Sequence, residues 1–133
     1  MQKKNVKNVL AAALMSTVLF FTPSLVLSAD VGNIDGLWAV PAAGAYFGMI
    51  RENQGLVLIT ALDGSDMTWD AFYGPISGNS ADIQLLLSSK LTEVAGNITF
   101  TSPDSGVMVI TNCQPPEACT LPCNMEIPFI KLF

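Results

Sequence analysis

Residues 96–113 read GNITFTSPDSGVMVITNC, and they indicate most directly how this chain folds. In the first part, Ile98 and Phe100 alternate with Asn and Thr residues, as in a strand that has one buried face. A stretch rich in turn-forming residues follows at 102–106, and a second β-rich run covers 107–113. Two such runs joined by a short turn predict an antiparallel hairpin.

The same alternation of β-rich runs and turns continues through the rest of the chain. Clusters of Gly, Pro, Asn, Asp and Ser separate the runs at nearly regular intervals, and the cluster at 74–79 is one of the expected turns. This spacing predicts an all-β fold, a small antiparallel up-and-down meander closed into an eight-stranded barrel, with a β-sandwich as the alternative. The expected strands are 37–40, 46–52, 56–62, 67–73, 81–88, 96–101, 107–113 and 125–133.

Three segments leave alternatives open. Residues 56–59 and 107–110 are apolar at every position. They fit either a strand covered on both sides or a strand whose outer side meets something apolar. Residues 83–94 could instead form a helix, because three consecutive leucines give a helical stripe and the polar residues at 79–82 could cap it. We expect a strand there.

The first 29 residues resemble a cleavable signal peptide. Three lysines lie within the first seven residues, an apolar run covers 9–21, and small residues lead to Ala29. A membrane anchor is the alternative, but it needs about 20 apolar residues, and this run is interrupted at Ser16 and closed by Pro23. We therefore expect cleavage after Ala29, a single domain over 30–133, and a secreted or periplasmic location.

Charge narrows the classes of partner. Residues 30–133 hold only three basic residues, Arg51, Lys90 and Lys131, and all eleven acidic ones, which gives a net charge of −8. A surface this acidic repels phosphate backbones, so no nucleic-acid partner is expected, and it disfavours anionic membrane surfaces. A domain of about 100 residues buries one core.

Short motifs give the chain a resemblance to a known family. They are the GLW segment at 36–38, PAAG at 41–44, a QG turn at 54–55, a DG turn at 63–64 with Trp69 behind it, and ISGN at 76–79. These resemble the G-x-W-x-x-P-x-x-x-G opening and the turns of a family of short, uncharacterised exported bacterial β-proteins, although Ala39 and Ala45 depart from its pattern. The resemblance implies a β fold and no established activity.

Gly36 and Trp38 also resemble the first strand of lipocalin-like and avidin-like barrels, in which the Trp closes one end of a ligand-holding cup. The alternative role for Trp38 is an ordinary core aromatic that fills the floor of the barrel. Tyr46, Trp69 and Tyr73 are the other aromatic residues with a polar group that could line such a cup. These four residues are the candidate ligand-binding residues.

The chain contains no His, which limits the catalytic mechanisms that it could use. Imidazole-dependent nucleophilic triads and His-bearing zinc sites are excluded, and we expect no enzymatic activity, no cofactor and no metal. Two carboxylate pairs could approach one another, Asp66 with Asp70 and Glu52 with Asp63. We interpret these acids, including the DGSD turn at 63–66, as surface and turn residues.

Three cysteines lie close together at positions 113, 119 and 123. An exported protein favours a disulfide, and an odd count leaves one thiol over. We expect Cys113 to pair with Cys123, because they stand at the two ends of the last link; Cys119 could pair with either one.

The function expected from these features is a binding or interaction module with an unidentified small molecule or protein as its partner. An outer-membrane β-barrel is the alternative, although spanning strands need about 9–11 residues and most of those expected here have about seven. A hydrolase that uses carboxylates is a third hypothesis.

Overall fold

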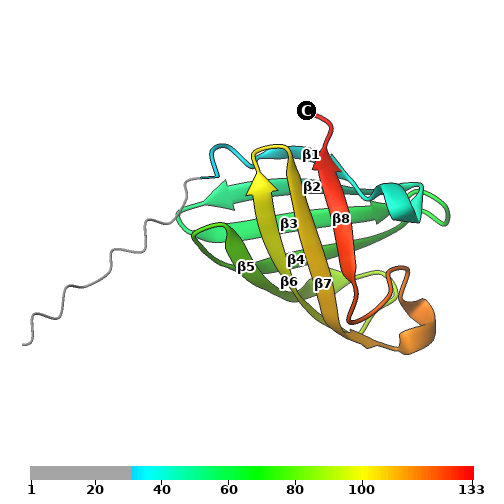
Figure 1. Ribbon diagram of the computed structural model, residues 1–133. Coiled ribbons are helices and arrows are strands. Elements are labelled where there is room, and N and C mark those ends of the chain that lie inside the picture. The colour runs from blue at the N-terminus through cyan, green and yellow to red at the C-terminus, as the bar shows by residue number, and fades with distance from the viewer. Residues whose placement is uncertain (1–30) are drawn as a thin grey trace, which may run out of the picture.

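A computed structural model describes residues 31–133 as one closed antiparallel barrel (Figure 1). The expected signal peptide, 1–29, lies outside the described residues. Each strand pairs with the next along the chain, and the last pairs with the first. The strands are β1 (Gly36–Ala39), β2 (Tyr46–Asn53), β3 (Leu56–Asp63), β4 (Thr68–Ser77), β5 (Ser80–Ser88), β6 (Glu93–Ser102), β7 (Ser105–Gln114) and β8 (Glu126–Lys131).

The predicted eight-stranded meander is confirmed, as a barrel and not as a sandwich. The helical alternative for 83–94 is wrong, because β5 runs to Ser88 and β6 begins at Glu93. Two short 3-10 turns, η1 (Pro41–Ala43) and η2 (Pro116–Ala118), are the helical elements of residues 31–133. No helix in this described part of the chain is long and apolar enough to cross a membrane.

Strand β4 is longer than the sequence predicts. The turn expected over 74–79 comprises only Gly78 and Asn79, because β4 continues through Gly74 and Pro75 to Ser77. A Cβ atom at position 74 would overlap the carbonyl oxygen of Asp82 on β5. Gly74 therefore allows a close approach of two strands inside the sheet and does not end one.

Three aromatic rings fill the end of the barrel nearest the C-terminus. Trp38 contacts Phe100 and Phe129 edge to face, with ring centroids 5.6 and 5.2 Å away, and is 2 % exposed. Its indole Nε1–H donates a hydrogen bond of 2.9 Å to the carbonyl oxygen of Ile34. Buried indole groups normally find such a partner. Trp38 therefore forms the floor of the barrel.

The barrel closes where its first and last strands meet (Figure 1). Trp38 pairs with Lys131, and Ala39 pairs with Ile130. Leu37 accepts a hydrogen bond of 2.7 Å from the backbone N–H of Leu132 and donates one of 2.9 Å to the carbonyl oxygen of Phe133. The last residues of the chain thus take part in the ladder that closes the sheet.

Candidate functional site

The end of the barrel opposite Trp38 is its mouth, and the link between β7 and β8 covers it. We call residues 114–125 the cap; it includes η2 and appears in orange in Figure 1. Leu121 of the cap reaches the barrel interior, where it lines two internal cavities together with Phe72 and Ile110. A side chain from a loop therefore forms part of the lining of the mouth.

A disulfide between Cys113 and Cys119 anchors the cap, and Cys123 is an exposed free thiol. The expected Cys113–Cys123 bridge is wrong. The turn η2 folds the chain back after Cys113, so that the Cα atoms of Cys113 and Cys119 lie 6.3 Å apart. The Cys113 side chain faces inward, whereas Cys123 lies beside Ile110 and faces solvent.

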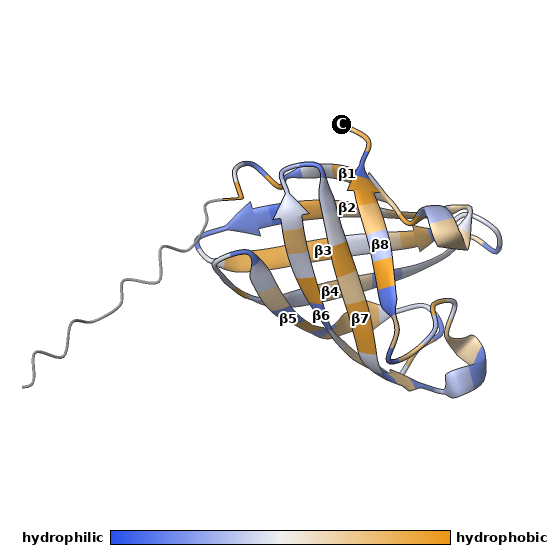
Figure 2. Ribbon diagram, viewed as in Figure 1, coloured by the Kyte–Doolittle hydropathy of each residue, from blue (hydrophilic) through white to orange (hydrophobic). Residues whose placement is uncertain are grey.

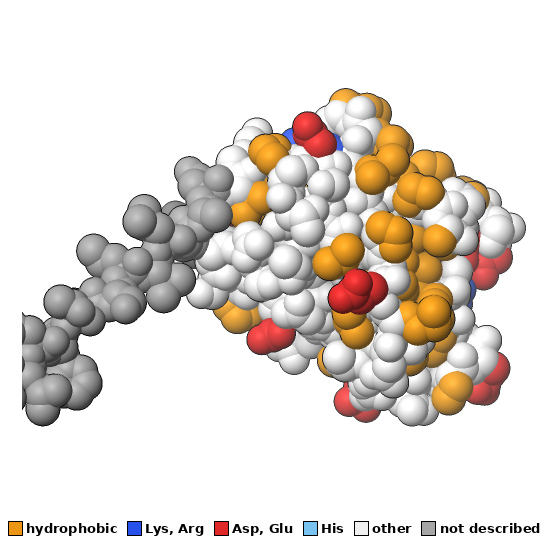
Figure 3. All heavy atoms as spheres, viewed as in Figure 1, with side chains coloured by type: hydrophobic (Ala, Val, Ile, Leu, Met, Phe, Trp, Pro, Cys, Tyr) orange, Lys and Arg blue, Asp and Glu red, His pale blue; other side chains and the backbone are white. Residues whose placement is uncertain are grey.

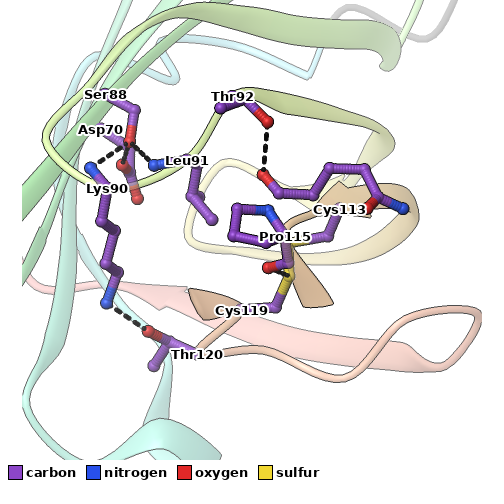
Figure 4. The surroundings of a disulfide bond; sticks show 10 residues. Asp70, Ser88, Lys90, Leu91, Thr92, Cys113, Pro115, Cys119 and Thr120 are labelled. Carbon is purple, nitrogen blue, oxygen red and sulfur yellow. Dashed lines mark hydrogen bonds between the residues drawn. A yellow bond between two sulfur atoms is a disulfide. The ribbon is translucent and has the colours of Figure 1, made fainter. Parts of the chain in front are cut away.

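Lys90 forms a second anchor for the cap, shown in Figure 4. Its Nζ lies 3.2 Å from Oγ1 of Thr120 in the cap and 3.2 Å from Oδ2 of Asp66. Thr120 in turn donates a hydrogen bond of 3.0 Å to Oδ2 of Asp63, which is 4.0 Å from Lys90 Nζ. These contacts connect the cap to the β3–β4 and β5–β6 links.

The two carboxylate pairs that the sequence left possible do not form, and the interpretation of these acids as surface residues is wrong for the buried Asp63 and Asp70. Glu52 and Asp63 lie at opposite ends of the barrel, because Asp63 pairs with Tyr46 at the start of β2, while Glu52 is near its end. Asp66 contacts Lys90 at the surface, whereas Asp70 is buried and accepts a hydrogen bond from Ser88. Neither of these two pairs therefore faces a groove as glycoside hydrolysis requires.

Asp63 and Asp66 both stabilise the β3–β4 turn. The side chain and the backbone N–H of Ser65 donate hydrogen bonds to Asp63, and together with Thr120 they lower the pKa of Asp63. The same two groups of Thr68 bind Asp66 and, with Lys90, lower its pKa. Within the described residues, no group of three or more Cys, Asp or Glu side chains is arranged to hold a metal ion.

Tyr46 and Asp70 place polar groups inside the mouth. Tyr46 is 9 % exposed and Asp70 is 5 % exposed. Burial, followed by the nearby carboxylates of Asp70 and Asp63, raises the pKa of Tyr46 well above its usual value. The phenol therefore stays protonated and remains able to donate a hydrogen bond.

The interior holds two small cavities. One, of about 50 Å³, is apolar and extends from Trp38 to Leu121. The other, of about 30 Å³, lies under the cap beside Asp70 and Leu91. Ligand pockets for drug-sized molecules measure roughly 300–1,000 Å³, so the closed barrel is filled by its own side chains.

Two of the four candidate ligand-binding residues face the interior of the barrel, and the other two face its outer surface. Trp38 and Tyr46 line the apolar cavity. Trp69 and Tyr73 do not, because they have the opposite parity to the buried residues Asp70 and Phe72 on β4 and therefore face outward. The Tyr73 hydroxyl accepts a hydrogen bond of 2.7 Å from Gln84 on the outer surface. The expected four-residue cup is thus wrong for Trp69 and Tyr73.

A second candidate site is the outer surface of β2, β3 and β4. In Figure 2 the ribbon of β3 is hydrophobic over most of its length, and Leu56 and Leu58, from the doubly apolar run, point outward and are 37 % and 42 % exposed. Cross-strand neighbours extend this surface in rows, one from Phe47 through Leu62 to Trp69. We define the apolar face as Phe47, Met49, Leu58, Thr60, Leu62, Trp69 and Ala71; the exposed Arg51, which is the cross-strand neighbour of Leu58 on β2, borders it.

The outer surface differs from one side of the barrel to the other. At the start of β5 and along β6 the outward positions are mostly polar, and Asp82 accepts a hydrogen bond from Asn97 there, whereas Leu86 and Leu87 are exposed at the end of β5. On the β1 side of the apolar face, Ala39 pairs with Phe47 of β2 and with Ile130 of β8. The outer surface is hydrophobic there as well. Figure 3 shows hydrophobic side chains gathered near β8 and the C-terminus, where Leu132 and Phe133 are exposed.

The whole chain is the basis of the comparison with known proteins. No family model, no curated protein and no solved structure matches it.

Proposed function

We propose that the protein is an exported interaction module that assembles through its apolar face, with a second copy of this chain as the partner. The observation that carries this proposal is the exposure of Met49, Leu58 and Trp69, each above 40 %, on one largely apolar surface that Arg51 borders. Exposed apolar surfaces of this kind mark interaction sites in soluble proteins. The disulfide is compatible with the oxidising compartment that export implies.

A second copy fits this face for two reasons. A two-fold interface brings the same surface together with itself, and a largely apolar surface does so with little repulsion although the domain carries a net charge of −8. At a strand spacing of about 4.8 Å, the outward rows from β2 to β4 span roughly 10 Å. This size favours an interface at the small, reversible end of the known range.

The other two functions have less support. A lipid-spanning barrel needs an apolar band on all of its strands and usually a polar interior, whereas β5 and β6 carry Asp82 and Asn97 outward and the interior holds Trp38, Phe100 and Phe129. A carboxylate hydrolase needs two acids across a groove, and the acids of the mouth instead bind hydroxyl groups and Lys90.

Sedimentation velocity over a concentration series tests the proposal. We expect the wild type to shift from monomer to dimer as its concentration rises from about 1 µM to 1 mM, the range in which small interfaces associate. Leu62→Glu should abolish the shift, because it places a charge between Phe47 and Trp69 on the apolar face. Gln84→Glu, which adds the same charge on the polar side, should leave it unchanged. A wild type that stays monomeric throughout would refute the proposal.

A further inference from the structure

Asp70 differs from the other buried acid of the mouth. Asp63 accepts hydrogen bonds from Ser65 and Thr120, and Lys90 lies 4.0 Å away. Asp70 is more deeply buried, accepts one hydrogen bond from Ser88, and has no cation within 4.0 Å among residues 31–133. Buried carboxylates are normally paired with a cation, so Asp70 offers an unmatched negative charge to the space beside it.

Tyr46 presents a second unused polar group to the same space. It is nine-tenths buried and lines both internal cavities. Its hydroxyl makes no hydrogen bond to the groups of residues 31–133, and it keeps some contact with solvent, because no fully buried polar side-chain atom of these residues lacks a partner. The cavity of about 30 Å³ between it and Asp70 has room for one group the size of a water molecule or an ammonium ion.

Apolar side chains continue from this polar space into the barrel. Tyr46, Phe72, Ile110 and Leu121 line both cavities and so form the passage between them. Beyond them lies the apolar cavity of about 50 Å³, which has room for a few carbon atoms. A polar pair at one end and an apolar space at the other match a short amphipathic molecule.

We propose that the chamber under the cap binds a small primary alkylammonium ion, with its ammonium group between the Asp70 carboxylate and the Tyr46 hydroxyl and its alkyl chain in the apolar cavity. The ammonium group supplies the charge that Asp70 lacks and donates hydrogen bonds to both oxygens. An anion is repelled by Asp70 and Asp63. A neutral alcohol of the same length leaves Asp70 without a cation.

The cap controls entry to this chamber. The partly buried Leu121 lines the chamber on the side of the cap, and the Cys113–Cys119 bridge and the Lys90–Thr120 hydrogen bond hold the segment that carries it. Ligands longer than about four carbons require Leu121 to move, because the space beyond it is small. The Leu121 side chain therefore limits the length of the alkyl chain that the chamber accepts.

Titration of the oxidised protein with butylammonium, 1-butanol and butyrate at constant ionic strength tests this site, with backbone amide chemical shifts as the readout. We expect saturable shifts at Tyr46, Phe72 and Ile110 with butylammonium in about the millimolar range, the range of such tiny ligands. Binding of 1-butanol should be at least tenfold weaker, and butyrate should not bind. No saturable shift with butylammonium, or equal affinity for the alcohol, would overturn the proposal.

Variants locate the site. Asp70→Asn should weaken butylammonium binding at least tenfold, whereas Asp82→Asn, which alters an exposed acid on β5, should not change it. Leu121→Ala should admit hexylammonium, which the wild type rejects. Unchanged butylammonium affinity in a folded Asp70→Asn protein would overturn the assignment. If that variant does not fold, the relative affinities of the wild type for butylammonium, 1-butanol and butyrate decide whether the site binds a cation. None of these measurements depends on self-association, so the two proposals fail independently.

Discussion

Replacing Trp38 by Phe tests whether this residue forms the barrel floor. The smaller ring leaves the carbonyl oxygen of Ile34 without its donor, in a residue that is 4 % exposed, and an unsatisfied buried group costs about 1–3 kcal/mol. The missing ring atoms leave a void next to Phe100 and Phe129 that costs about 1 kcal/mol more. We expect the free energy of unfolding to fall by about 2–4 kcal/mol, a large part of the 5–15 kcal/mol that is typical of small domains.

Urea unfolding followed by far-ultraviolet circular dichroism measures this change. The matched control is Trp69→Phe, because Trp69 is 43 % exposed on the outer face and its replacement should change the free energy of unfolding by no more than about 0.5 kcal/mol. Trp38→Phe should also lower the melting temperature by about 10 °C or more. Equal midpoints for the two variants would refute the role assigned to Trp38.

Three further predictions concern the disulfide, the acids of the mouth and a close contact between strands. Cys119→Ser should lower the free energy of unfolding by about 2 kcal/mol, the chain-entropy value for so short a loop, while Cys123→Ser should change it by less than about 0.5 kcal/mol; a Cys123 linkage in a non-reducing peptide map would contradict this. The lowered pKa of Asp63 means that its stabilising contribution is present above about pH 4 and is lost as the pH falls through its folded value. Asp63→Asn should therefore flatten the acid side of the stability profile, and an unaltered profile would count against the hydrogen bonds assigned to it. Gly106→Ala should destabilise the barrel by about 1–3 kcal/mol in urea unfolding, because the added methyl group overlaps the Phe129 ring; an unchanged midpoint would show that Phe129 is free to shift.

Local sequence patterns were sufficient to locate the strands along the chain, although not to fix the length of each one. The alternation around Ile98 and Phe100 identified β6 correctly, since residues with period 2 on a half-buried strand leave a clear signal. The length of β4 was not predictable from local signals. Gly74 and Pro75 look like a turn until the neighbouring backbone of Asp82 is known to pass beside them.

Predicting the residues of the candidate site required knowledge of contacts between residues that are distant in the sequence, which local patterns do not supply. The sequence singled out Trp38 and Tyr46, which do face inward, but it could not assign parity to Trp69 and Tyr73 without knowing that Asp70 lies inside. Asp70 itself gave no signal, because an acid next to a Trp in a β-rich run is ordinarily a surface residue. The disulfide partner of Cys113 was also beyond local patterns, since the fold of the cap decides it.

The pairing of β1 with β8 has a consequence for how the chain acquires its structure. Leu37 bonds to Leu132 and Phe133, so the contact that closes the cylinder joins residues about a hundred positions apart. Bringing such distant segments together costs loop-closure entropy that only the completed ladder compensates. Until its last residues are available, the chain is an open sheet with two unpaired edges, which is a template for pairing with other chains. Loss of even the final two residues should therefore favour aggregation over a merely less stable barrel.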